Sequence, residues 1–321
     1  MRRKVLLQLV VPLLSLCVLF FLLATEPAGA LPRPLVQLSV IFREDDPVWA
    51  TTRDGMEQAA ADLGAELRFL APAEPNDAEE QKLLLERELD AGAEGVVLIP
   101  ADRQLLADPA RAAGSVLVTL ETEMEDTDGC VSVDNDALGE ALARSALNGV
   151  PRGGTVVLLD SAPGDNGIRE RLKAARALLE QEGRHVVQLI PTEKETLAGR
   201  LPNMLKRTNP EAVLAFEATA LEDAADLVRT INSEKSRTHR EPPLLYGMGS
   251  TPAIAAALEQ NHITAIQAQD EFSAGYIAVM TAVQAIRHQG TGSPEPLPFL
   301  VVRRENMYDR DRQKLMFPVT R

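Results

Sequence analysis

A short polar stretch and a tryptophan follow the apolar run at residues 35–41. Asp46 in this stretch can accept hydrogen bonds from hydroxyl groups. Trp49 is the single tryptophan of the chain, and its indole face can stack on the apolar face of a sugar ring. The same tryptophan could instead anchor the following helix to the core. The sequence leaves both interpretations of Trp49 open.

A carboxylate lies at the end of a second apolar run. Glu121 directly follows the apolar run at residues 115–120. If that run is a strand, its end should direct Glu121 into a cleft. We expect the nearby Glu123 and Glu125 to be solvated.

An arginine follows a third apolar run, at residues 155–160, after a loop rich in glycine, proline and aspartate. Arg169 lies at the beginning of the next predicted helix. Its planar guanidinium can bind hydroxyls or a carboxylate in bidentate fashion. We expect Arg171, two residues further on, to be a surface or ion-pairing residue.

Sequence motifs of the common enzyme classes are missing. The four histidines show no metal-ligand spacing, and neither a G-x-S-x-G elbow nor a Walker A lysine motif occurs. Cys17 and Cys130 form neither a disulfide framework nor a cysteine-based metal site, and residues 126–129 lack the ligand alternation of a calcium loop. A catalytic carboxylate pair is the one mechanism that stays open. We therefore expect a protein that is not an enzyme and that has no cofactor and no metal.

Composition excludes further partners. The net charge is -14 with a pI near 4.9, so phosphate backbones are repelled and no nucleic-acid partner is expected. The 321 residues exceed one ordinary core and suit two lobes.

The amino terminus has the pattern of an export segment. Three basic residues at positions 2–4 precede an uncharged run of residues 5–25. The run is long enough to span a bilayer as an anchor. Cleavage after the small residues at 28–30 and lipidation of Cys17 are the alternatives. Residues 1–30 are thus a predicted signal anchor or signal peptide, preceding an extracytoplasmic remainder.

Between these landmarks, apolar strands alternate with amphipathic helices. Strands are predicted at residues 35–41, 66–70, 95–99, 115–120, 130–133, 155–160, 185–190, 212–216 and 244–246. A long final helix follows, with apolar positions between residues 272 and 286. Strands that are apolar throughout favour parallel sheets covered on both faces. The predicted fold is α/β, with two doubly wound parallel-sheet lobes preceded by an N-terminal hydrophobic helix.

Several segments together resemble one known family. They are W-x5-G-M-x2-A-A-x2-L-G at 49–64, V-L-I-P-A-D at 97–102, V-D-N at 133–135, R-E-R at 169–171, Y-G-M-G-S-T-P at 246–252, Q-x5-G at 269–275, and E-N-M-Y-D with L-M-F-P at 305–318. In this order and spacing the chain resembles the periplasmic-binding-protein-like I superfamily, the ribose/galactose-type sugar-binding proteins, over residues 35–318.

The resemblance implies a site and a lobe division. It implies ligand contacts near Asp46, Trp49, Glu121, Arg169 and Gln269, with Asn135 beside the first hinge strand. It also implies three crossings between the lobes, near residues 134–135, 269–270 and 298. The lobes would then comprise residues 35–134 plus 270–297 and residues 135–269 plus 298–321, joined by a three-stranded hinge.

Two positions depart from the family pattern. Sugar binders of this family usually carry Asn-Asp where this chain has residues 217–219, Glu-Ala-Thr, and Asp where it has Gly249. Glu217 is our candidate to replace one of the missing contacts. The departures put an ordinary pentose or hexose in doubt, because a hydroxyl site loses discrimination with its polar partners.

Together these features predict a solute-binding protein for a small polar ligand, a carbohydrate, that serves an ABC importer through its membrane permease. The alternative is a sensing module that presents its ligand to a membrane receptor or histidine kinase. A sugar-responsive repressor would need a DNA-binding helix-turn-helix in place of the apolar segment at residues 5–25, so we reject it.

Overall fold

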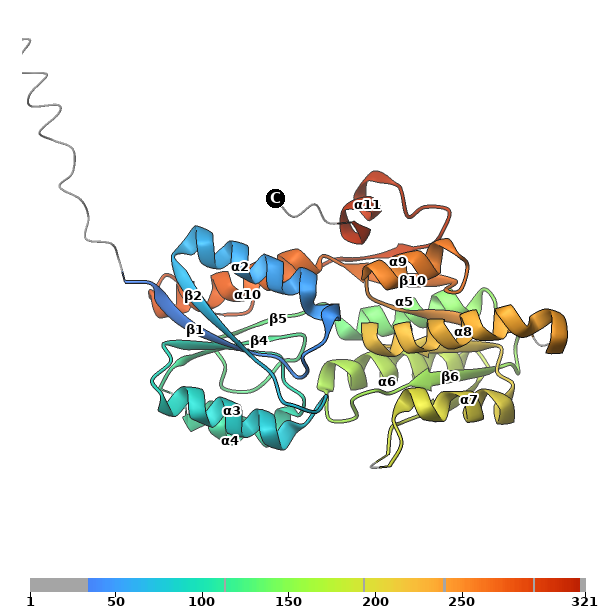
Figure 1. The fold of residues 1–321 in the computed structure, drawn as a ribbon, viewed down its shortest axis with the longest axis horizontal. Coiled ribbons are helices and arrows are strands. Elements are labelled where there is room, and N and C mark those ends of the chain that lie inside the picture. Colours follow the sequence, from blue (N-terminus) through green and yellow to red (C-terminus); the bar gives the residue numbers. More distant parts are fainter. Residues whose placement is uncertain (1–33, 113, 193, 239–240, 291, 318–321) are drawn as a thin grey trace, which may run out of the picture. The chain divides into compact units, whose positions relative to one another are not determined.

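The first lobe is built on a five-stranded parallel sheet (Figure 1). The computed structural model describes residues 34–112, 114–192, 194–238, 241–290 and 292–317. The sheet has the order β2-β1-β3-β4-β5. Its strands are β1 (Val36–Ile41), β2 (Ala65–Leu70), β3 (Gly95–Leu98), β4 (Val116–Leu120) and β5 (Gly129–Val131).

Helices cover both faces of this sheet (Figure 1). The 3-10 helix η1 (Pro47–Trp49) leads into α2 (Ala50–Leu63), which packs with α10 (Glu271–Ile286) on one face. The helices α3 (Ala78–Asp90) and α4 (Arg103–Ala112) pack on the other face. Successive strand residues point to opposite faces, so Val97 faces α2 and α10 while Val96 faces α3 and α4. Both faces are therefore apolar, as predicted for parallel strands.

The second lobe contains a six-stranded sheet with the order β11-β10-β9-β8-β6-β7. Its strands are β6 (Thr155–Leu159), β7 (His185–Leu189), β8 (Ala212–Ala215), β9 (Leu244–Met248), β10 (Ala265–Gln269) and β11 (Phe299–Val302). Neighbouring strands of this sheet pair in parallel, except that β10 and β11 are antiparallel. The predicted pair of parallel-sheet lobes is confirmed, with this one antiparallel edge as the difference.

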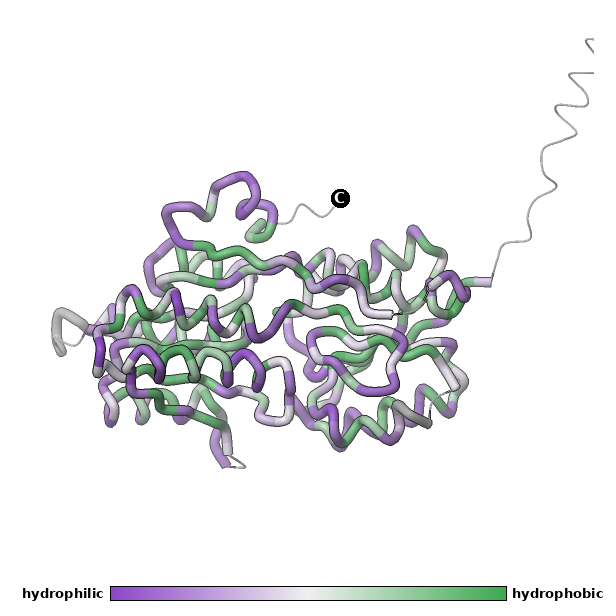
Figure 2. Tube along the Cα trace, turned by 180° about the vertical axis from the view of Figure 1, so that it is seen from behind, coloured by the Kyte–Doolittle hydropathy of each residue, from purple (hydrophilic) through white to green (hydrophobic). Residues whose placement is uncertain are grey.

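The second sheet is also covered on both faces. One face is covered by α5 (Asn135–Leu147) and α6 (Asn166–Gln181), and the other by α7 (Leu197–Thr208), α8 (Ala218–Thr238) and α9 (Pro252–Glu259). The short α11 (Arg310–Met316) contacts β10. In Figure 2 the apolar stretches run along the strands inside each lobe and the hydrophilic stretches lie outside.

The chain passes between the two sheets at three connections. They join β5 to α5, β10 to α10, and α10 to β11. Two of them touch, since Val133 forms an isolated parallel bridge with Leu297. The predicted lobe boundaries at residues 134/135, 269/270 and 297/298 stay predictions, and each lies in one of these connections.

The predicted N-terminal signal segment, residues 1–30, lies outside the described residues. Within the part of the chain that the structure describes, no helix has the length and apolar character needed to cross a membrane. Residues 36–321 form one compact unit, and both sheets belong to it.

Candidate functional site

A buried arginine lies where the strand ends of the two lobes meet. Arg43 follows β1 of the first lobe, and its side chain is almost fully buried, with 2% of the residue exposed. Its Nη1 atom lies 2.7 Å from Asp165 Oδ2 and 3.3 Å from Glu121 Oε2. Its other nitrogens lie 3.8 Å from Glu217 and 3.7 Å from Glu44. Since Asp165 and Glu217 belong to the second lobe, one guanidinium links the carboxylates of both lobes.

The carboxylates of this network stabilise the charged form of Arg43. Burial acts to lower the pKa of Arg43, but Glu121, Asp165, Glu217 and Glu44 outweigh it and raise the pKa above its ordinary value. Arg43 is therefore charged at every physiological pH. A buried cation with several carboxylate partners is costly to desolvate, so such a network requires good geometry.

Asp165 holds the second lobe to the first through two contacts. Besides Arg43, it accepts a hydrogen bond from Thr122 Oγ1 at 3.0 Å, and Thr122 follows β4 of the first lobe. Asp165 also caps α6 by accepting from the Ile168 amide at 3.0 Å. The helix N-terminus and the arginine together stabilise its negative charge.

Glu121 has a backbone conformation that is uncommon for its residue type. Its φ angle is 69°, in the left-handed region that non-glycine residues seldom adopt. Strain of this kind persists where surrounding structure fixes it, and it gathers at functional sites. The prediction that Glu121 points into a cleft agrees with its place in the small cavity described next.

A small cavity lies deep between the lobes, with a volume of about 30 Å³. Such a volume holds little more than a water molecule or two. The cavity is lined by Arg43, Val48, Trp49 and Glu121 with Glu217, Ala218, Met248, Gly249 and Glu271. It thus brings together three of the predicted residues, Trp49, Glu121 and Glu217.

Both interpretations of Trp49 are compatible with its position. It is 4% exposed and its ring packs against Phe42 with centroids 5.5 Å apart, which makes it part of the core. The same ring lines the small cavity, and the Arg43 guanidinium lies 5.3 Å from its centroid.

Carboxyl groups near the cavities have raised pKa values, among them Glu271 and Glu44. Burial raises the pKa of Glu271 to about 7, and repulsion from Glu121 adds to this effect. Burial raises the pKa of Glu44 to about 6, although the Arg43 charge acts to lower it. Perturbed carboxyl groups in a cleft are candidates for a functional site.

A larger cavity of about 670 Å³ adjoins the same residues. It shares Arg43 and Glu217 with the small cavity, and Asp46 lies in its wall. The other lining residues come from the loops that follow strands in both lobes and from the N-terminal parts of α3, α7 and α8. Its volume is typical of small-molecule sites, which span roughly 300–1,000 Å³.

The structure corrects the prediction that Arg171 lies at the surface, while Arg169 as a ligand contact stays a prediction. Arg169 is exposed and lines neither inter-lobe cavity, whereas Arg171 is 1% exposed. Arg171 donates to the Asn135 side chain at 2.7 Å and to the Phe216 carbonyl at 3.0 Å. The helix periodicity carried this signal, since residue 171 is three residues after Ile168 on the buried face.

Two further predicted residues lie at the crossings between the lobes. Asn135 begins α5 and is 8% exposed, and its Nδ2 atom lies 3.4 Å from the Glu121 carbonyl. Gln269 ends β10, is 4% exposed and donates to Glu271 at 3.0 Å. Neither side chain lines the two cavities, but each contacts a residue that does.

Sequence reasoning missed Arg43, Asp165, Arg171 and Glu271. Arg43 stood in the same loop as the predicted Asp46, and Asp165 stood in the loop before Arg169. Their positions after strands were visible, but the burial of their side chains was not.

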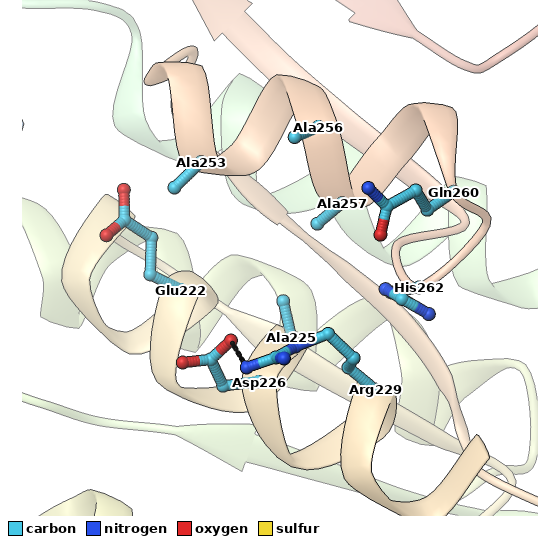
Figure 3. A pocket seen from close by; sticks show the side chains of 9 residues that line it. All are labelled: Glu222, Ala225, Asp226, Arg229, Ala253, Ala256, Ala257, Gln260 and His262. Carbon is cyan, nitrogen blue, oxygen red and sulfur yellow. Dashed lines mark hydrogen bonds and ion pairs between the residues drawn. The ribbon is translucent and has the colours of Figure 1, made fainter. Parts of the chain in front are cut away.

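Figure 3 shows a cavity of another kind, about 330 Å³ in volume, between α8 and α9. Alanines form much of its wall, and Arg229 pairs with Asp226 at 2.9 Å beside it. All of its lining residues belong to the second lobe, so movement of the lobes would not enclose a ligand there.

Two doubly wound lobes with a cavity at their facing strand ends define a two-lobed solute-binding protein. The chain belongs to the periplasmic binding protein family, whose domain model matches residues 38–290. Members of such a family bind substrates and do not convert them.

Individual proteins match this chain over different shares of its length. The D-xylose-binding periplasmic protein of Escherichia coli (strain K12) is 29% identical over 126 residues, which are 38% of this chain and 37% of that protein. The match thus spans little more than a third of the relative.

Solved structures share the fold over most of the chain. A carbohydrate transporter solute-binding protein from Agrobacterium radiobacter, in complex with D-arabinose, has a TM-score of 0.78 at 16% identity and covers 88% of this chain and 99% of its own. The myo-inositol-binding protein of Caulobacter, bound to myo-inositol, has a TM-score of 0.74 at 20% identity and covers 89% and 100%.

Proposed function

We propose that this protein captures a small polar solute, a carbohydrate, between its lobes and delivers it to the membrane permease of an ABC importer. The observation that carries the proposal is the 670 Å³ cavity, whose walls come from both lobes of a periplasmic-binding-protein fold. The similar proteins from Agrobacterium and Caulobacter, with a bound sugar and a bound cyclitol, support a carbohydrate as the class of solute.

Capture works through closure of the lobes about their three connections. A solute that contacts residues of both lobes binds the closed form more tightly than the open form. This difference in affinity drives closure, and the connections act as the hinge. A permease that recognises the closed form then receives only loaded protein.

Particular residues have distinct roles in this proposal. Asp46 and Glu217 line the large cavity and accept hydrogen bonds from the solute hydroxyl groups, while Trp49 and Glu121 contact the solute from the adjoining small cavity. Arg171 supports the site through Asn135. Gln269 positions Glu271 at the wall of the deep cavity.

The protein works outside the cytoplasm in this proposal, as befits its family. Residues 1–30 would direct export and either tether the chain to the membrane or be removed. In the alternative, a sensing module, the same solute site would serve a membrane receptor. The two differ in the partner that binds the closed form, a permease or a receptor.

The test is a thermal-shift screen of the full chain in mild detergent against sugars, polyols, nucleosides and amino acids. A solute at about 100 times its Kd stabilises the native state by about 2.7 kcal/mol. At roughly 2–4 °C per kcal/mol, the melting temperature should rise by about 5–10 °C.

Recovery of the unchanged solute after long incubation checks that binding occurs without turnover. If no carbohydrate raises the melting temperature, the proposal is contradicted. A chain that binds and converts its sugar would contradict the binding role.

A further inference from the structure

The large inter-lobe cavity is strongly acidic. Among the described residues, six carboxylates line it, and Arg43 is the one cationic side chain in its wall. The carboxylates are those of Glu44, Asp46, Glu74, Asp102, Glu217 and Asp223. Hydroxyl groups of a neutral sugar need acceptors, but they do not need this excess of charge.

Like charges face each other across the cleft. Asp46 belongs to the first lobe, and Glu217 and Asp223 belong to the second. Although Asp223 is an exposed residue, partial desolvation raises its pKa, and repulsion from Glu217, Asp226 and Asp46 raises it further. This repulsion opposes closure of the lobes unless a positive charge enters between them.

Arg43 compensates only part of this charge. Its short contacts go to Asp165 and Glu121, deep in the cleft. In the described part of the chain, Asp223 has no ion pair. Asp46 accepts from the Val48 amide at 2.9 Å, a contact that caps η1 without neutralising the carboxylate.

Hydrogen-bond donors without a well-aligned acceptor line the same cavities. The indole N–H of Trp49 is buried at the small cavity and forms no well-aligned hydrogen bond among the described residues, although it lies close enough to Glu44 to lower the pKa of that carboxyl. The Thr219 hydroxyl at the large cavity is likewise buried and unpartnered within the described ranges. Both can donate to a hydroxyl oxygen, which a simple amine does not offer.

We propose that the solute is an amino sugar, with its ammonium group between Asp46 of the first lobe and Glu217 and Asp223 of the second. This inference rests on the proposed function and narrows its class of solute. The ammonium converts repulsion across the cleft into attraction, so it favours the closed form specifically. The sugar hydroxyls meet the free donors of Trp49 and Thr219.

The first experiment measures binding of matched solutes to the full chain by calorimetry. Glucosamine, galactosamine and mannosamine are each compared with the neutral parent hexose and with the N-acetylated form, which has no charge. We expect at least one amino sugar to bind tenfold or more tightly than its two neutral counterparts.

Three outcomes would overturn this proposal, and they differ in what else they affect. A neutral sugar that binds as tightly as its amino form would refute the charge selection but leave the carbohydrate-binding role intact. Tight binding of putrescine or calcium ions without any amino sugar would refute the carbohydrate part. Absence of binding by every carbohydrate would refute the proposed function as well.

Site-directed variants then locate the ammonium. Asp223→Asn removes one charge and keeps the shape, and it should weaken the amino sugar about tenfold while leaving affinity for the neutral parent unchanged. The matched control is Asp90→Asn, because Asp90 is exposed at the far end of α3, away from the cavity.

Thermal unfolding of both variants verifies that they fold. The Asp223→Asn substitution breaks no bond that the described residues form with Asp223, so we expect no loss of stability. Equal amino-sugar affinities for Asp223→Asn and Asp90→Asn would refute the assigned place of the ammonium.

Discussion

At the scale of single residues, the cleft contains carboxyl groups that are buried, although carboxyl groups are ordinarily exposed to water. Glu271 shows this most clearly, because burial raises its pKa to about 7. Its neighbours are Glu121, which raises the pKa, and Gln269, Arg171 and Thr52, which lower it. A group of this kind makes folding stability depend on pH.

We predict that the wild type loses stability relative to Glu271→Gln as pH rises from about 4.5 to about 7. Below this range the carboxyl is protonated in both the folded and the unfolded state. Within it the unfolded chain ionises first, so the native state is penalised until its own carboxyl ionises. The difference should amount to about 2–3 kcal/mol between pH 4 and pH 8.

Urea unfolding at several pH values measures this effect. The control is Glu57→Gln, which removes an exposed carboxylate from the neighbouring helix α2. A pH dependence that is the same for wild type, Glu271→Gln and Glu57→Gln would show that Glu271 ionises freely in the folded protein.

At the scale of the elements, glycines set the distance between paired helices. A Cβ atom at Gly55 of α2 would lie 2.0 Å from the Phe272 carbonyl oxygen of α10, and one at Gly275 would lie 2.0 Å from that of Thr52. The same arrangement recurs in the second lobe, where Gly139 of α5 meets the Arg171 carbonyl. Glycine at these positions allows backbone to touch backbone.

We predict that Gly55→Ala destabilises the protein by about 1–3 kcal/mol, because the added methyl group must push α2 and α10 apart. This loss exceeds the gain of roughly 1 kcal/mol that alanine brings to a helix. Chemical denaturation measures the change in the free energy of unfolding.

Gly199→Ala in α7 is the matched control. The three atoms nearest its added Cβ are side-chain atoms of Glu195 and Thr196, 3.2–3.6 Å away, and the position is exposed. This control should leave stability unchanged or raise it slightly. Equal effects at residues 55 and 199 would show that the contact between α2 and α10 is not tight.

The order of elements was largely readable from the sequence. Apolar runs placed β1, β3, β6 and β8 because a strand buried on both faces needs apolar residues throughout. Two strands were missed: β10, because the buried Gln267 and Gln269 interrupt its apolar pattern, and β11, because its four residues lie at the edge of the sheet and are mostly half-buried. Its antiparallel direction depends on the path of the chain after α10 and has no local signal.

At the scale of the whole molecule, Arg43 is the electrostatic link between the lobes. It compensates carboxylates that would otherwise face each other across the cleft. The Arg43 guanidinium is thus a permanent positive charge at the place where the two lobes are proposed to close.

We predict that Arg43→Met opens the lobes and destabilises the protein by about 3–5 kcal/mol, because buried carboxylates lose their counter-charge. Small-angle X-ray scattering should show a larger radius of gyration than for the wild type. Arg43→Lys keeps the charge but loses the planar fork, so its effect should be intermediate. Identical scattering of Arg43→Met and wild type would mean that the lobes are held together by other contacts.

The sequence by itself determined the two α/β lobes, and it predicted a site at the strand ends with Asp46, Trp49, Glu121 and Glu217, each of which lines one of the two inter-lobe cavities. Hydrophobic periodicity is a local property, so strands, helices and the loops between them can be read directly. Only the tertiary structure decided which charged side chains are buried. Arg169 and Arg171 stand two residues apart, and the packing of α6 against α5 turns one to solvent and the other inward. The role of Arg43 was likewise invisible, because its partners Glu121, Asp165 and Glu217 lie 78 to 174 residues away along the chain and come together only when both lobes have folded.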